Sequence, residues 1–494
     1  MKEPNEVRVV AVNRQQTAMR IVRVEGLIEV DHPVRAIWEF VGRLDLGRFY
    51  GRIDAVKGGE GRPAWDPRMM ISLWAYAYSR GVSSAREISR LCEYDPAYQW
   101  LTGLQVVNHH SLSDFRVAYK AELEGLFTQM LGVLTSEGLI TLERVMHDGT
   151  KIKACASGDS FRREERLRSH LEKAREQVKL MEEAGEEEVA PRLARVRRRA
   201  AREHQERMEQ AVRELEQLQE AKKGDEAKKV RVSMTDPEAR IMKQPDGGFA
   251  PSYNAQISTD AAHGVIVGVG LTQSGVDHGE LEPALEKIQE VMGRLPEQAV
   301  VDGGYIAWET VLALDAMDVD LIGPALERGP QQQEQQLVRK GIAKEFHADA
   351  FTYAEEKDIF TCPEGKTLRH SGTENAPGRT SHIYECKAAD CLQCPMKGQC
   401  CPRNGSNGRT IRRTELHPTV QTWIDRMETE EAKAIYRNRS QVAEFPNAWI
   451  KAKYRLRQFR SRGKRKAGVE VLWACFTYNV QLWTRLCWRP AMTG

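Results

Sequence analysis

Two segments that are expected to form β-strands each lead into an aspartate followed by glycine. The first contains His147-Asp148-Gly149, and the second, Ala299-Val300-Val301, ends in Asp302-Gly303. Sites of open α/β sheets collect at the carboxyl ends of strands, and a glycine after the aspartate lets the backbone turn away and leaves room for a ligand. We therefore expect Asp148 and Asp302 to share one site, although either aspartate alone also fits an ordinary turn.

The segments around these aspartates predict a mixed sheet flanked by helices. Gly264 indicates a hairpin, and Asp277 and Glu280 are expected to cap a helix. The order of elements is typical of an α/β core. Strands are expected at 142–152, 253–258, 265–271, 299–301 and 319–322, and helices at 280–292, 308–317 and near 430–460.

The region before the first strand has apolar residues at helical spacing, which predicts an all-helical N-terminal domain over residues 29–135. Within it, residues 83–100 and 108–116 have the pattern of two helices joined by a turn, with Ser111 as the N-cap of the second. One interpretation is a helix-turn-helix that contacts DNA through Arg86, Arg90 and Arg116. The alternative is a helical packing module that does not touch DNA.

Residues 160–230 are dominated by Glu, Arg, Lys, Gln and Ala, with leucines at near-heptad intervals. Because Gly185 and Pro191 interrupt this stretch, a helical hairpin or coiled-coil arm is expected. Charges of mixed sign are typical of an exposed helix surface, so we assign no catalytic residue to the arm.

Six of the ten cysteines lie between Cys362 and Cys401. In a large cytosolic chain such clustering favours metal binding over disulfides. Four thiols suffice for a tetrahedral structural zinc. The predicted ligands are Cys386, Cys391, Cys394 and Cys400, with Cys401 as an alternative to Cys400 and Cys362 as a further thiol upstream. Reduced thiols without a metal are the alternative, because the spacing is irregular. Residues 330–415 are expected to form an inserted, Cys-rich lobe.

A third acid, Glu444, is followed seven residues later by Lys451. This interval is about two helical turns, so both side chains would share one helix face, although Pro446 interrupts the region. Four nearby glutamates are alternatives to Glu444, and none has a lysine seven residues later: Glu428, Glu430, Glu431 and Glu470.

The segment from Lys451 to Lys466 carries nine Lys or Arg residues and no acid, with Tyr454 and Phe459 interleaved. This basic run predicts contacts to DNA phosphates. The alternative is a solubilising helix surface. The residues expected to bind phosphates are Arg457, Arg460, Lys464 and Arg465.

These residues together resemble a known enzyme family. Asp148, Asp302 and Glu444 are similar to the Asp-Asp-Glu (DDE) catalytic set of bacterial insertion-sequence transposases. That family also has a Tyr-Arg-Glu-Lys signature, which Tyr436, Arg439, Glu444 and Lys451 resemble, with one residue more between Arg439 and Glu444 than the commonest spacing. The strings 147–152, 253–256 and 301–305 and the helical N-terminal region also resemble the family, so the matches span most of the chain.

The resemblance implies a ribonuclease-H-like α/β catalytic domain over residues 136–485, interrupted by the arm and the Cys-rich lobe. It implies that Asp148, Asp302 and Glu444 hold two divalent cations, Mg²⁺ or Mn²⁺, for DNA cleavage and strand transfer. Lys451 and Arg439 would neutralise phosphate charge, and Tyr436 would contact a nearby nucleotide. The implied partners are terminal inverted repeats and target DNA, bound by a homodimer.

The composition is that of a globular protein, and its nearly balanced charge does not identify a binding partner. Lys and Arg number 73 against 70 Asp and Glu, and the hydrophobic fraction of 41% is that of a globular chain. Neither a signal peptide nor a run of roughly 20 apolar residues is found, so a cytoplasmic, nucleoid-associated protein without membrane contact is expected. Two further functions stay open: a DNA-binding regulator with inert carboxylates, and a nuclease that cuts without joining.

Overall fold

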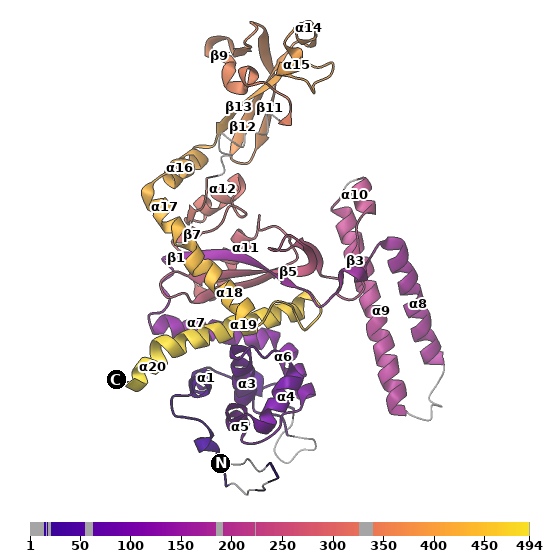
Figure 1. Cartoon of the computed structure of the whole chain (residues 1–494), viewed down its shortest axis with the longest axis vertical. Coiled ribbons are helices and arrows are strands. Elements are labelled where there is room, and N and C mark those ends of the chain that lie inside the picture. Colours follow the sequence, from indigo (N-terminus) through magenta and orange to yellow (C-terminus); the bar gives the residue numbers. More distant parts are fainter. Residues whose placement is uncertain are drawn as a thin grey trace, which may run out of the picture.

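The described part of the chain is mixed α/β, with sheets of six, five and two strands. Figure 1 shows the six-stranded sheet in the middle, the helices of residues 33–136 at one end and the five-stranded sheet at the other. None of the described helices is long and apolar enough to cross a membrane. The computed structural model describes residues 14–15, 17, 21–54, 63–183, 191–222, 224–325 and 339–493.

The six-stranded sheet has β1 (Arg144–Lys153) at its centre. β1 pairs antiparallel with β5 (Phe249–Asp260) and parallel with β7 (Gln298–Val300), beyond which lies the parallel strand β8 (Asp320–Ile322). The expected strands and hairpin are thus confirmed. β7 ends opposite Met146, whereas β1 continues to Lys153, so Asp148 lies within β1 and not at its carboxyl end as expected. The other two strands pair with β5 and are β4 (Arg240–Lys243) and β6 (Ile266–Thr272).

Helix α19 (Lys464–Trp483) lies between the sheet and the N-terminal helices, and it contacts both β6 and α3 (Pro67–Ser79). It is therefore buried along most of its length. Asn479 on this helix accepts a hydrogen bond from the Ile266 backbone N–H at 2.9 Å and donates one to the Ile266 carbonyl at 2.8 Å. This amide satisfies backbone groups of the edge strand β6, so helix and sheet are joined by directional bonds.

The N-terminal region is helical as predicted, but two details of the helix-turn-helix interpretation are wrong, the cap at Ser111 and the DNA contact of Arg116. Arg86 and Arg90 are exposed, and their contact with DNA stays a prediction. Helix α6 (His109–Ala118) begins after Asn108, whose side chain accepts the His110 N–H, so Ser111 lies inside the helix and does not cap it. Arg116 is only 7% exposed because it donates to the Ser83 carbonyl at 2.8 Å and packs over the Trp74 ring. A buried arginine of this kind holds the helices together and is not available to DNA.

The charged arm is the predicted helical hairpin of α8 (Glu164–Glu183) and α9 (Pro191–Glu220), which lies beside the sheet in Figure 1. Leu167, Leu171 and Leu215 are buried between the two helices. The arm therefore has a small core of its own. The predicted break at Gly185 lies outside the described residues.

The Cys-rich lobe forms an antiparallel sheet and a second hydrophobic core, separate from that of the central sheet. Buried Phe360, Leu368 and Tyr384 make up the middle of this core. Residues 330–338 of the predicted lobe lie outside the described ranges. Its strands are β9 (Thr352–Ala354), β10 (Ile359–Thr361), β11 (Thr367–Ala376), β12 (Arg379–Cys386) and β13 (Thr410–Leu416).

Candidate active site

Asp148 and Asp302 lie at the same level of neighbouring parallel strands. Met146 of β1 is paired with Val300 of β7, and each aspartate follows two residues later. Asp302 is held in a tight turn, because its Oδ1 accepts the Gly304 N–H at 2.8 Å. The pairing register therefore brings the two predicted aspartates together.

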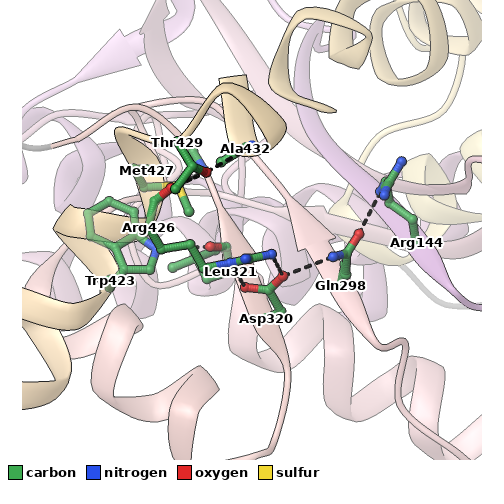
Figure 2. A network of polar contacts seen from close by, with 10 residues as sticks. Arg144, Gln298, Asp320, Leu321, Trp423, Arg426, Met427, Thr429 and Ala432 are labelled. Atoms are coloured by element: carbon green, nitrogen blue, oxygen red, sulfur yellow. Dashed lines mark hydrogen bonds and ion pairs between the residues drawn. The ribbon is translucent and has the colours of Figure 1, made fainter. Parts of the chain in front are cut away.

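The chain returns from the Cys-rich lobe to the sheet through α16 (Pro418–Met427) and α17 (Glu430–Arg437). Arg426 binds Asp320 in a bidentate pair, with Nε–Oδ1 at 2.9 Å and Nη2–Oδ2 at 2.6 Å, and Asp320 also accepts the Gln298 amide (Figure 2). Gln298 in turn accepts a hydrogen bond from Arg144. This network joins the first residues of β1, β7 and β8 to α16, and so fixes where the following helices begin.

Glu444 comes next, at the end of a π-helical turn, η6 (Ser440–Glu444), that leads into α18 (Phe445–Ala452). Pro446 lies in the first turn of α18, which continues directly from the π-helical turn, so its missing N–H interrupts the hydrogen-bond ladder next to that wider turn. A helix was expected to continue to about residue 460, but α18 ends at Ala452. The wide turn accommodates the extra residue between Arg439 and Glu444.

Arg439 connects two of the predicted carboxylates. Its Nη2 lies 3.0 Å from Glu444 Oε1, and its Nη1 lies 3.6 Å from Asp148 Oδ1. The Nη1 atom is buried without a hydrogen-bond partner. The guanidinium thus partly neutralises carboxylates that would otherwise repel each other.

Asn447 also belongs to this site, although the sequence reasoning missed it. Its Nδ2 donates to Asp148 Oδ2 at 2.9 Å, and its Oδ1 is buried without a partner. The signal was available, because position 447 is one helical turn after Glu444 and one before Lys451, on the same helix face.

Burial raises the pKa of Asp148 to about 6, while the charge of Arg439 and the hydrogen bond from Asn447 lower it. The charges of Asp302 and Glu444 raise it further, so all three carboxylates lie within electrostatic reach of one another. Burial lowers the pKa of Lys451, and the nearby Asp148 charge raises it.

A chain of hydrogen bonds lies behind Asp148. His147 is fully buried, with Nδ1 2.8 Å from Ser258 Oγ and Nε2 2.8 Å from Gln256 Oε1. Tyr305 also donates to Gln256 Oε1, at 2.6 Å. Burial lowers the pKa of His147 to about 4, so the imidazole is neutral near pH 7 and acts as a positioning group.

The remaining predicted DNA-binding residues lie around this site or beyond α18. Tyr436 is half-buried against the main core. Arg457, Arg460 and Arg465 are exposed and Lys464 is half-buried, as phosphate contacts require. Tyr454 and Phe459, in contrast, are buried in the core, so they anchor the basic run and do not alternate with it on the surface.

The lobe cysteines gather around a cavity of about 20 Å³. The Cys391 sulfur accepts the Arg409 N–H at 3.3 Å, and the Cys362 sulfur accepts the Lys366 N–H at 3.2 Å. Burial and a hydrogen bond with Cys391 raise the pKa of the Cys386 thiol to about 12. The cavity is lined by Cys362, Cys386, Cys391, Cys394, Cys400 and Cys401.

The active-site carboxylates and the lobe cysteines are the two candidate metal sites. Carboxylate oxygens suit Mg²⁺ and Mn²⁺, and thiols suit Zn²⁺, so the donor chemistry fits in both places. Within the described ranges, however, no group of three or more His, Cys, Asp or Glu side chains is arranged to hold an ion. The donors are neighbours but do not converge on one point.

Two family models match the sequence. Residues 361–483 match the transposase DDE domain, a range that contains Arg439, Glu444, Asn447 and Lys451. Residues 22–118 match the transposase domain DUF772, which corresponds to the N-terminal helices. No curated protein and no solved structure matches the chain. The two family matches support an insertion-sequence transposase of the DDE type.

Proposed function

We propose that this chain is a DNA transposase that cleaves the ends of its insertion sequence and joins them to target DNA. The observation that carries the proposal is the register of β1 and β7, which places Asp148 beside Asp302 next to the helix of Glu444. The strand order around β1 is compatible with a ribonuclease-H-like core. We take this core to extend over residues 136–485, with the arm and the Cys-rich lobe as insertions.

Asp148, Asp302 and Glu444 would hold the divalent cations of the reaction, Mg²⁺ or Mn²⁺. When bound, two such ions activate a water or a DNA 3′-hydroxyl and stabilise the leaving oxygen. Asn447 orients Asp148 by its hydrogen bond. Arg439 pairs with Glu444 and so holds that carboxylate close to Asp148. Lys451 and Arg439 supply positive charge for a phosphate at the site, and Tyr436 would contact a neighbouring nucleotide.

The DNA partners would be the terminal inverted repeats and the target. Exposed Arg457, Arg460 and Arg465, with Lys464, provide charge for the phosphate backbone outside the site. A homodimer would hold the two ends of the element. A regulator with inert carboxylates is disfavoured, because Asn447 and Arg439 both contact Asp148 as supports of a working site would.

Cleavage of an oligonucleotide that carries the element's end tests this function. Asp148→Ala, Asp302→Ala and Glu444→Ala should each abolish Mg²⁺-dependent cutting, while a mobility-shift assay should show nearly unchanged DNA binding. Glu290→Ala, an exposed acid on α11 (Leu281–Met292), is the matched control and should cut like the wild type. Full cutting by Asp148→Ala would contradict the site. Cutting by the wild type without joined products would favour the alternative function, a nuclease that cuts DNA without joining it.

A further inference from the structure

Asp277 lies beside Gly149 and Gly304, which closely follow Asp148 and Asp302 in the sequence. It does not cap α11, as the sequence suggested, because the N-cap is Glu280 and makes no side-chain capping bond. A Cβ built on Gly149 would collide with Asp277 Oδ1. One built on Gly304 would lie 3.0 Å from Asp302 Oδ1 and 3.6 Å from Asp277 Oδ2. The glycine after Asp148 thus leaves room for the Asp277 carboxyl group, and also for Gln256 Nε2 and the Tyr305 hydroxyl, which such a Cβ would meet at 2.8 and 2.9 Å.

Two amides hold this carboxyl group in place. Asn254 Nδ2 donates to Asp277 Oδ1 at 2.7 Å, and Gln256 Nε2 donates to the same oxygen at 3.1 Å. Gln256 is oriented by its bonds to His147 and Tyr305. Both amides act on Oδ1, and Oδ2 is the oxygen that faces Gly304 and the Asp302 side.

Three carboxyl groups lie around the buried hydroxyl of Tyr305. Burial raises the pKa of Tyr305 most, and the charges of Asp277, Asp148 and Asp302 each raise it further. Like charges in a half-buried place repel each other, and a bound cation converts that repulsion into attraction. Asn254, 1% exposed, also has its Oδ1 buried without a partner at this place.

We propose that Asp277 is a fourth carboxylate of the active site and binds a divalent cation together with Asp302. This inference rests on the proposed function, because it concerns the same cations. It assigns Oδ2 of Asp277 as the oxygen that contacts the ion, while Oδ1 stays bound to Asn254 and Gln256.

Binding of Mn²⁺ to the full chain, measured by titration calorimetry, tests the assignment. Asp277→Asn keeps an oxygen for the two amides but removes the charge, and it should weaken Mn²⁺ binding at least tenfold. Asp302→Asn is the positive control and should also weaken binding. Glu280→Gln, three residues away on the same turn, should bind Mn²⁺ as the wild type does, because Glu280 instead accepts a hydrogen bond from Thr272.

Thermal unfolding in EDTA separates cation binding from a structural role. Removing one of several like charges should leave the unfolding midpoint of Asp277→Asn unchanged or raise it. Weaker Mn²⁺ binding with a lowered midpoint would make Asp277 structural and overturn the proposal. Wild-type affinity in Asp277→Asn, with loss in Asp302→Asn, would overturn it and leave the proposed site intact. No Mn²⁺ binding by the wild type would overturn both.

Discussion

Asn447 donates a hydrogen bond to Asp148 across 299 positions of sequence, at 2.9 Å. Asn447 is on α18, directly after the turn that carries Glu444, and Asp148 is on the central strand. One side chain thus fixes both the orientation of the first carboxylate and the distance of the helix that supplies the third.

Replacing Asn447 by Ala should therefore reduce cleavage without loss of DNA binding. Residues that orient metal ligands typically change metal affinity or activity by about 10- to 100-fold. Asn447→Asp should be worse still, because it puts a negative charge beside Asp148. The measurements are cleavage rate against Mg²⁺ concentration and a mobility shift. Asn375→Ala, exposed in the lobe, is the control, and equal rates in Asn447→Ala and this control would contradict the role.

The Arg426–Asp320 pair should stabilise the fold and place the helix of Glu444. A double-mutant cycle with Arg426→Ala and Asp320→Ala should give a coupling of about 1 kcal/mol in urea unfolding, because the pair is bidentate but about one-third exposed. Arg426→Lys should lose part of that energy, since lysine lacks the planar fork. Arg412→Ala, which removes a more exposed pair with Glu374, should change stability less. A coupling energy near zero would mean that the Arg426–Asp320 pair does not contribute to the stability of the fold.

The basic run should bind DNA through phosphates. Replacing Arg457, Arg460, Lys464 and Arg465 by Gln should weaken binding to specific and unrelated DNA alike, because phosphates carry no direct sequence information. The slope of log affinity against log salt should flatten by somewhat under one unit per lost contact. Affinity measured over a salt series decides this. An unchanged slope would contradict this role and indicate that the DNA lies over the N-terminal helices instead.

The thiols of the lobe should bind one structural zinc per chain. The gathering of six thiols around one cavity favours this, and backbone N–H groups donate to the sulfurs of Cys362 and Cys391. Elemental analysis of protein purified without chelator should find about one zinc per chain. The variants Cys386→Ser and Cys391→Ser should lose the zinc. The control Cys92→Ser, in the N-terminal core, should keep it. A metal-free but folded and active protein would favour reduced thiols.

The sequence by itself determined the local elements. Alternating residues before Asp148 and the short apolar run before Asp302 predicted β1 and β7, and the pattern of the arm predicted its hairpin. The spacing of Glu444 and Lys451 predicted a shared helix face, but Glu444 lies on the π-helical turn before α18, which carries Lys451. These features depend on neighbours within a few turns, and local periodicity encodes them directly.

Only the tertiary structure decided which side chains meet. Asp277 has the pattern of a helix cap, yet two amides of β5 turn it toward the site. Arg116 and Tyr454 have the pattern of a DNA-contacting surface, yet both are buried. The physical reason is the same in each case. A side chain's partner is set by strand register and helix packing between segments far apart in the chain, and no local pattern carries that information.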